Sequence, residues 1–262
     1  EVIRLARTVD DTHLFGARSG CGGSGSLWAV TMFPYQLTSG AAHLDFVSPE
    51  GYGYGPSNIS DAALVTRYAL WAGHGKPVFW AEFGQHVWQG GEAAIEKQRQ
   101  LYELFADMVR RSGAQGWAGW WFPGGYRVDE RSDYGIIEQG WIPRPSARVL
   151  GETAERLKTA PPPKLAAPMI VEAEHAPQGL ARIVLEQGKA FRAVYDSGAV
   201  AEVRTRGTGT TSQDCPPTGL GGVSYTAPGP IEFLNAEVAV LGREGGSVRV
   251  EIINTGEATL LP

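Results

Sequence analysis

The feature that most limits the possible folds is a short apolar run, Pro77 to Ala81, bounded by Gly75 and Gly84. A run of this length between glycines is typical of a strand buried on both faces, as in a parallel sheet. The strand delivers a carboxylate, Glu82, two residues before Gly84. Proteins of the α/β class place catalytic groups at this end of their strands. A glutamate here can equally cap the next helix or pair with a surface arginine, so the run alone leaves both roles open.

The first ~158 residues alternate between helical and strand-like patterns. A long amphipathic helix is expected over residues 91–112, with Gly113 at the position that favours a left-handed C′ residue. Ser60 or Asp61 is expected to cap another helix. Strands separated by helices predict βαβ units and a parallel sheet. Four such units make about half of an eight-unit (β/α)8 barrel. The expected strands are residues 13–17, 44–48, 77–84 and 116–122, and the expected helices are 1–9, 60–71, 91–112 and 145–157.

The pattern changes after residue 158. Residues 159–170 include Pro161, Pro162 and Pro163 and are expected to form a stiff, extended linker. From there on, short apolar stretches alternate with turn residues, which predicts a small all-β domain over 171–262, a two-sheet sandwich. Its expected strands are residues 183–186, 191–195, 199–204, 231–234, 236–240 and 247–253.

Composition excludes several classes of function. A net charge of −5 does not suit a nucleic-acid surface, and no apolar run approaches the ~20 residues that span a bilayer. The five histidines, the serines and the glycine-rich segment 20–25 match neither a zinc-protease, a serine-hydrolase nor a phosphate-loop motif. Cys21 and Cys215 make no metal site, and whether they pair cannot be deduced from their positions. No cofactor and no metal are therefore expected.

Three segments in order carry a family resemblance: Leu44-Asp-Phe-Val-Ser-Pro-Glu-Gly-Tyr52, the Lys76-to-Gly84 strand, and Gly116-Trp-Ala-Gly-Trp-Trp-Phe122. They resemble the last three strands of a clan A glycoside hydrolase, the clan of families 5, 39 and 42. Residues 13–18 similarly resemble the fifth strand. The resemblance covers residues 1–157 and implies the C-terminal half of a (β/α)8 barrel.

The resemblance also implies roles for particular residues. Glu82 matches the nucleophile of a retaining glycosidase, which attacks the anomeric carbon and forms a glycosyl-enzyme intermediate. Tyr52 matches a tyrosine that hydrogen-bonds the nucleophile, and Trp120 matches the tryptophan platform beneath the reacting sugar. Trp121 is expected on the opposite side of the strand, in the core. Trp88 follows Glu82 on its loop and either walls a sugar subsite or packs on the surface.

Two departures from the clan pattern matter. Glu50 stands where the clan often carries a histidine. Because close carboxyl groups raise the pKa of one of them, Glu50 can donate a proton; alternatively it binds a sugar hydroxyl or pairs with Arg18 or Arg127. Arg18 itself is placed among the substrate-binding residues. The larger departure is that the clan's Asn-Glu pair, which supplies the acid/base carboxyl on the fourth strand, is absent from the chain.

The sequence therefore predicts a retaining hydrolase of a β-linked glycan or glycoside whose second carboxyl comes from elsewhere. The missing carboxyl is expected from an N-terminal half-barrel chain, since the chain opens on a mid-helix pattern, or from self-association that closes the sheet. The alternative function is a non-catalytic carbohydrate-binding or scaffolding protein derived from a glycosidase.

Overall fold

The computed structural model describes residues 2–18, 41–171, 179–205, 236–244 and 247–254. The chain divides into two compact units, Glu1–Tyr225 and Thr226–Pro262. The first unit carries the predicted site. Cys21, Cys215 and the predicted strand 231–234 lie outside the described residues.

Parallel strands follow one another across the sheet of the first unit in chain order. They are β1 (Gly16–Arg18), β2 (Phe46–Ser48), β3 (Glu50–Gly51), β4 (Phe79–Phe83) and β5 (Gly116–Gly119). β1 pairs with β2, a Val47–Val78 bridge joins β2 to the start of β4, and β4 pairs with both β3 and β5. This sequential order is that of a (β/α) barrel and has no reversal of the kind that marks a doubly wound sheet.

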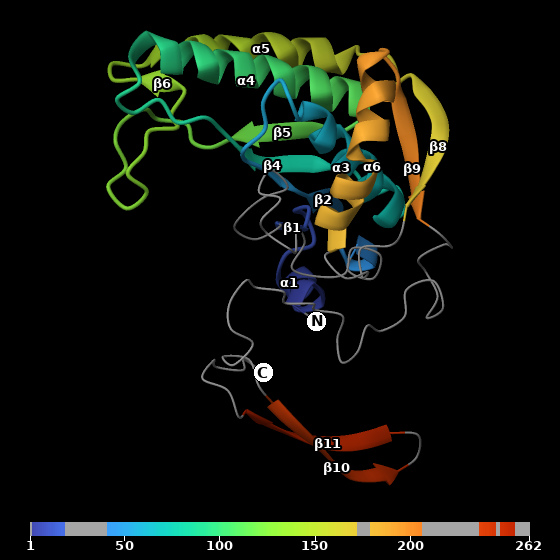
Figure 1. Ribbon diagram of the computed structural model, residues 1–262. Helices are drawn as coiled ribbons and strands as arrows, with labels where there is room; N and C mark the ends of the chain where they lie inside the picture. Colours follow the sequence, from blue (N-terminus) through green and yellow to red (C-terminus); the bar gives the residue numbers. More distant parts are fainter. Residues whose placement is uncertain (1, 19–40, 172–178, 206–235, 245–246, 255–262) are drawn as a thin grey trace. The chain divides into compact units, whose positions relative to one another are not determined.

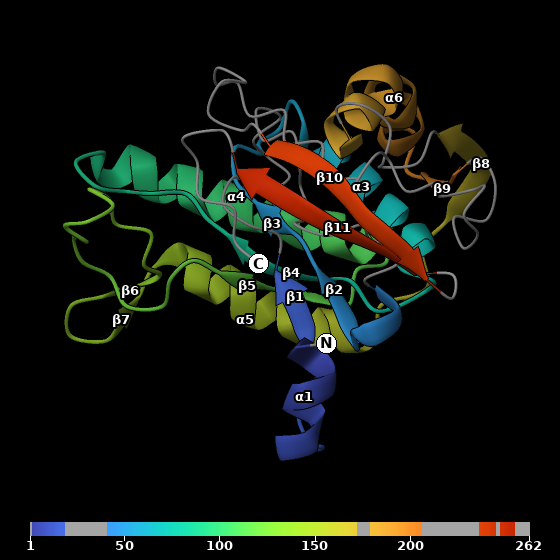
Figure 2. The same ribbon diagram turned by 90° about the horizontal axis from the view of Figure 1, so that it is seen from below.

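Helices alternate with these strands, which confirms the α/β prediction for this part of the chain. α1 (Val2–Val9) precedes β1, the short 3-10 helix η1 (Ala41–His43) precedes β2, and α3 (Ile59–Ala72), α4 (Gly91–Ser112) and α5 (Pro145–Lys158) follow β3, β4 and β5 in turn. α3, α4 and α5 lie on one face of the sheet (Figures 1 and 2). α4 ends as predicted at Gly113, whose φ of 81° is left-handed and therefore favours glycine.

A bulge in β4 decides where Glu82 points. Between Trp80 and Phe83 the register with β5 shifts by one residue, so β4 carries an extra residue there. Trp80 and Phe83 both pack on Phe105 of α4, at ring centroid distances of 5.4 and 4.1 Å, and both are fully buried. Because these two residues face the helices, Glu82 is turned to the opposite face of the sheet.

The residue that caps the N-terminus of helix α3 differs from the predicted one. Its N-cap is Asn58, and neither Ser60 nor Asp61 caps it. Both side chains instead meet Arg192, whose Nε donates to Ser60 Oγ at 3.1 Å and whose guanidinium lies 3.8 Å from Asp61 Oδ1. Burial raises the pKa of Asp61, while the charge of Arg192 opposes that rise. The pair joins α3 to a segment expected to belong to another domain.

That segment corrects the domain prediction. β8 (Leu165–Val171) and β9 (Val200–Thr205) form a parallel pair, with α6 (Gly179–Asp196) between them in the chain. α6 and β9 contribute to the same hydrophobic core as α3 and α4, through residues such as Phe191 and Val203. The linker prediction is therefore wrong from Leu165 onward. The two strands predicted at 183–186 and 191–195 are wrong as well.

Two features explain why these predictions are wrong: the spacing of the buried residues in α6, and Pro168 within β8. The buried residues of α6 recur at helical intervals, a period that is not visible when only four or five residues are read at a time. They are Ile183, Val184, Gly188, Phe191 and Tyr195. In β8 the register shifts between Ala166 and Met169, on either side of Pro168. A proline has no N–H for the ladder, and an irregularity of this kind accommodates it within a strand.

The second unit contains one antiparallel hairpin, β10 (Ala236–Glu244) with β11 (Ser247–Asn254), which confirms two of the predicted strands. Within the described ranges no second sheet packs on this hairpin, so the sandwich is not seen.

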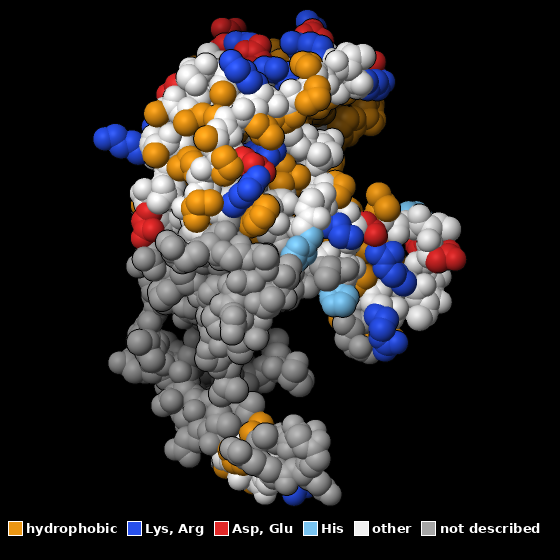
Figure 3. Space-filling model, turned by 90° about the vertical axis from the view of Figure 1, so that its right-hand side faces the viewer, with side chains coloured by type: hydrophobic (Ala, Val, Ile, Leu, Met, Phe, Trp, Pro, Cys, Tyr) orange, Lys and Arg blue, Asp and Glu red, His pale blue; other side chains and the backbone are white. Residues whose placement is uncertain are grey.

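In the first unit, the loop between β5 and α5 holds a further small hairpin, β6 (Ile137–Glu138) with β7 (Ile142–Pro143). On the face shown in Figure 3, hydrophobic side chains are spread among polar and charged ones over the described part of the surface. β8 exposes Leu165 and Ile170, and α6 exposes Leu185.

Candidate active site

Glu82 and Tyr52 form the centre of the site. The Tyr52 hydroxyl donates a 2.5 Å hydrogen bond to Glu82 Oε1, and Glu82 is only 8% exposed. Burial first, and then the hydrogen bond and charge of Glu82, raise the pKa of Tyr52, so the hydroxyl keeps its proton at any working pH. A phenol that donates to one carboxylate oxygen fixes the orientation of that carboxyl group.

Glu50 lies beside this pair, as the sequence predicted. It is the direct partner of Glu82 in the parallel register of β3 and β4, and its side chain is buried. The carboxylate charge of Glu50 also contributes to the raised pKa of Tyr52. Arg127, one of its suggested partners, pairs instead with Asp129 and Glu130.

Trp120 follows β5 and lies next to the Glu82 strand. Its backbone N–H donates to Phe83 O at 2.7 Å, and its indole Nε1 donates to Glu130 Oε2 at 3.2 Å. The peptide bond between Trp120 and Trp121 is cis. Trp121 is not in the core as predicted, because β5 ends at Gly119 and strand alternation does not extend that far. It is partly exposed, and its ring lies 5.8 Å from that of Trp120.

Sequence reasoning missed Glu130 and Tyr134 of the loop between β5 and α5, and it gave Arg127 of the same loop a different role. The guanidinium of Arg127 lies 5.4 Å from the ring centroids of both Trp120 and Trp121. The Tyr134 ring meets that of Tyr52 edge-on at 5.9 Å. Burial, and then the charges of Glu130 and Glu82, raise the pKa of Tyr134. Arg127, Glu130 and Tyr134 carry no spacing signal, since they sit in an irregular loop that only the folded chain brings back over β4.

The other two predicted site residues, Trp88 and Arg18, come from other positions near the carboxyl ends of the strands. Trp88 is on the loop after β4, where its ring stacks on Tyr126 at 4.3 Å. Arg18 is the last residue of β1, opposite Ser48 of β2, and its side chain lies outside the described part of the structure.

The described residues contain neither a candidate metal site nor a candidate membrane-spanning helix. They contain no cluster of three or more His, Cys, Asp or Glu side chains that could hold a metal ion. Among the helices of the same ranges, none combines the length and the apolar character needed to cross a bilayer.

Comparison with known proteins shows which solved structures have a similar fold. No family model and no curated protein matches the chain. A GH5_18 structure from Streptomyces cattleya in complex with GlcNAc aligns with a TM-score of 0.53 and 17% identity, over 81% of this chain and 54% of that chain. A GH5_18 structure from Bifidobacterium longum subsp. infantis aligns with 0.53 and 16%, over 72% and 50%. A polyextremophilic beta-galactosidase from the Antarctic haloarchaeon Halorubrum lacusprofundi aligns with 0.52 and 16%, over 78% and 33%.

The fold is like part of a barrel glycoside hydrolase. At 16–17% identity the likeness shows the fold alone. The chain spans about half the length of the GH5_18 structures that it matches. The roles of individual residues therefore rest on the geometry of the site.

Proposed function

We propose that the chain is part of a retaining glycoside hydrolase acting on a β-linked glycan or glycoside, with Glu82 as the nucleophile. The observation that carries the proposal is the 2.5 Å hydrogen bond from Tyr52 to Glu82 at the carboxyl end of a parallel strand. Trp120 follows the next strand in the sheet and offers an aromatic ring for stacking on the sugar.

In this mechanism an oxygen of the ionised Glu82 carboxylate attacks the anomeric carbon, and the bond to the leaving oxygen breaks. A second carboxyl group protonates that oxygen, then deprotonates the water that releases the sugar with its configuration retained. Tyr52 positions Glu82 by holding one of its oxygens. Asp129 and Glu130 pair with Arg127, whose guanidinium lies 5.4 Å from the ring centroids of Trp120 and Trp121, which suits a neutral sugar.

The second carboxyl group of a retaining pair lies ~5–5.5 Å from the first. We propose that it comes from a half-barrel segment that joins the sheet, or from a second copy of the chain. Within the described ladders β1 pairs only with β2 and β5 only with β4, so each offers an open edge to a further parallel strand. α1 beside β1 buries no residue and exposes Val2, Leu5 and Val9 along one stripe, which suits packing against a further helix.

The proposed function is tested with two substrates that differ in their leaving group. A 2,4-dinitrophenyl β-glycoside needs no proton to depart, whereas a methyl β-glycoside does. We expect the chain alone to turn over the first and not the second, and proton NMR to show the β-anomer of the sugar as the first product. Inverted configuration, or turnover that survives Glu82→Gln, would contradict the proposal. Sugar binding without turnover of either substrate would favour a non-catalytic carbohydrate-binding protein.

Tyr52→Phe is expected to lower kcat for the dinitrophenyl glycoside by about ten- to a hundredfold, because a hydrogen bond to a charged group contributes about 1.5–3 kcal/mol. Since the ring and its contact with Tyr134 are kept, the midpoint of thermal unfolding should change little. Steady-state kinetics and a thermal melt check both. An unchanged kcat would show that Tyr52 does not position the nucleophile.

A further inference from the structure

Two exposed aromatic rings lie outside the site described above. The rings of Trp88 and Tyr126 pack against each other at a centroid distance of 4.3 Å with 35° between their planes, and each remains about 40% exposed. We propose that this pair is a second saccharide-binding subsite. The inference rests on the proposed function and deepens it, since the substrate would then be an oligosaccharide or polysaccharide rather than a simple glycoside.

The position of the pair supports a sugar as its occupant. Trp88 lies on the loop after β4, six residues beyond Glu82, and Tyr126 lies on the loop after β5. Tyr126 directly precedes Arg127, whose guanidinium lies over Trp120 and Trp121. The pair and the platform are therefore connected by consecutive residues of one loop at the carboxyl ends of the strands.

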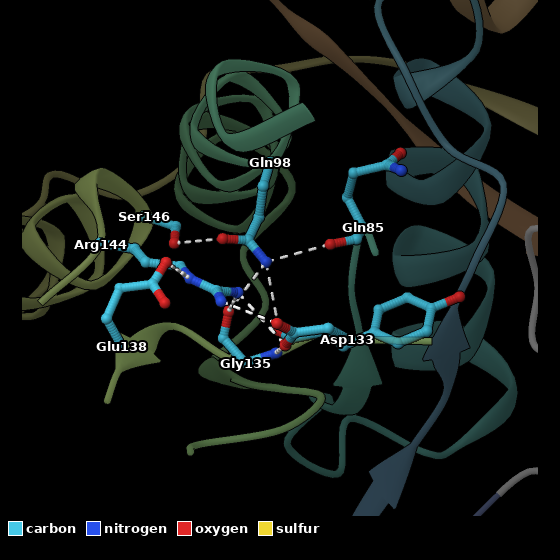
Figure 4. A network of polar contacts seen from close by, with 8 residues as sticks. Gln85, Gln98, Asp133, Gly135, Glu138, Arg144 and Ser146 are labelled. Carbon is cyan, nitrogen blue, oxygen red and sulfur yellow. Dashed lines mark hydrogen bonds and ion pairs between the residues drawn. The ribbon is translucent and has the colours of Figure 1, made fainter. Parts of the chain in front are cut away.

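The two loops are fixed to each other by a buried polar network (Figure 4). Gln98 of α4 is fully buried, and its Nε2 donates to Gln85 O on the first loop at 3.0 Å and to Gly135 O on the second at 3.1 Å. In addition, Val87 N donates to Asp133 O at 2.7 Å, next to Trp88. The rings are thus held in place before any ligand arrives, which lowers the entropy lost on binding.

The charges on these loops favour a neutral ligand. Arg127 is paired with Asp129 and Glu130 at 2.9 Å, so no excess of positive charge is present for a nucleic acid. A flat ring with an exposed face is suited to the apolar face of a pyranose. A second exposed aromatic pair, Phe122 with Trp141, lies in the same β5–α5 connection but has its centroids 6.4 Å apart. It serves as a matched control.

The experiment is calorimetric titration of the full chain with β-1,4-linked gluco- and manno-oligosaccharides of one to four units. For one of the two series we expect the Kd to fall about tenfold when the added unit reaches the pair, a gain of the size of one aromatic contact. Trp88→Ala and Tyr126→Ala should each remove that gain and leave the affinity for the shortest bound sugar unchanged. Trp141→Ala should keep the gain. Thermal melts of all three variants show whether each is folded.

The proposal is overturned if no oligosaccharide binds, if affinity does not depend on length, or if the length dependence survives Trp88→Ala and Tyr126→Ala. Glu82→Gln separates this proposal from the hydrolase. If that variant keeps the gain with length while the wild-type chain shows no turnover, the subsite stands and the proposed hydrolase fails. If turnover depends on Glu82 but affinity shows no gain with length, the hydrolase stands and the subsite fails.

Discussion

Replacing Glu82 by glutamine is expected to lower kcat for a dinitrophenyl β-glycoside by about 10⁴-fold or more, because the covalent step then has no nucleophile. In the wild-type chain the Tyr52 hydroxyl donates to Glu82 Oε1 at 2.5 Å. Glutamine has nearly the same shape as glutamate, and its amide oxygen can still accept this hydrogen bond. The thermal melting curve should therefore change little. Initial-rate measurements on purified protein check the loss, and a kcat within tenfold of the wild type would contradict the assignment.

Glu50→Gln is the matched control, since Glu50 is buried in direct register with Glu82. If Glu50 only organises the site, this variant loses far less activity toward the dinitrophenyl glycoside than Glu82→Gln does, and neither the wild-type chain nor the variant turns over the methyl glycoside. If Glu50 is the proton donor, the wild-type chain turns over the methyl glycoside, and Glu50→Gln loses that turnover while it keeps most of its activity toward the dinitrophenyl glycoside. Comparing the two substrates on the two variants thus separates an in-chain acid from one supplied by a joining segment.

Arg144→Met is expected to lower the free energy of unfolding by about 3–5 kcal/mol, the usual cost of removing one partner of a buried ion pair. Arg144 is 4% exposed, and its Nη2 lies 2.8 Å from Asp133 Oδ2. Its other nitrogens donate to Gly135 O and to Glu138 Oε1 (Figure 4). Without the guanidinium, Asp133 stays buried with no opposite charge, and the loop that carries Tyr134 loses its main anchor.

Urea unfolding measures this effect, with Arg127→Met as the control. Arg127 also pairs with two carboxylates, but solvent reaches these groups and screens the pairs, so its loss should cost much less than the loss of Arg144. Adding Asp133→Leu to Arg144→Met should recover part of the stability, because the second change removes the unpaired charge. Equal costs for Arg144→Met and Arg127→Met would show that the buried pair does not hold this loop.

Much of the barrel-like part follows from local patterns in the sequence. The α4 helix is found over the predicted residues because its apolar stripe has a clear helical period and Gly113 supplies the left-handed end. The run around Trp80 and Phe83 forms a strand because glycines bound it and the rings of both residues are buried against Phe105 of α4. Register then brings Glu50 next to Glu82, a proximity that the family resemblance implied.

The rest depended on contacts between distant residues. The bulge that turns Glu82 away from the helices appears only when β4 is aligned with β5. Tyr134 reaches Tyr52 because Gln98 and Arg144 fold the loop back, and no local spacing encodes that path. Residues 183–195 were predicted as strands because short apolar windows suit either element, and packing of Phe191 into the core shared with α3 selects the helix.

A nucleophilic Glu82 becomes covalently attached to the sugar during each turnover. The most direct test is incubation with 2-deoxy-2-fluoro β-glycosyl fluorides, whose leaving group needs no acid, followed by intact-mass and peptide mass spectrometry. We expect one added fluorosugar mass, located on the peptide that contains Glu82 and absent from Glu82→Gln. An adduct on another residue, or none on folded protein that binds the sugar, would contradict the role of Glu82 as the nucleophile.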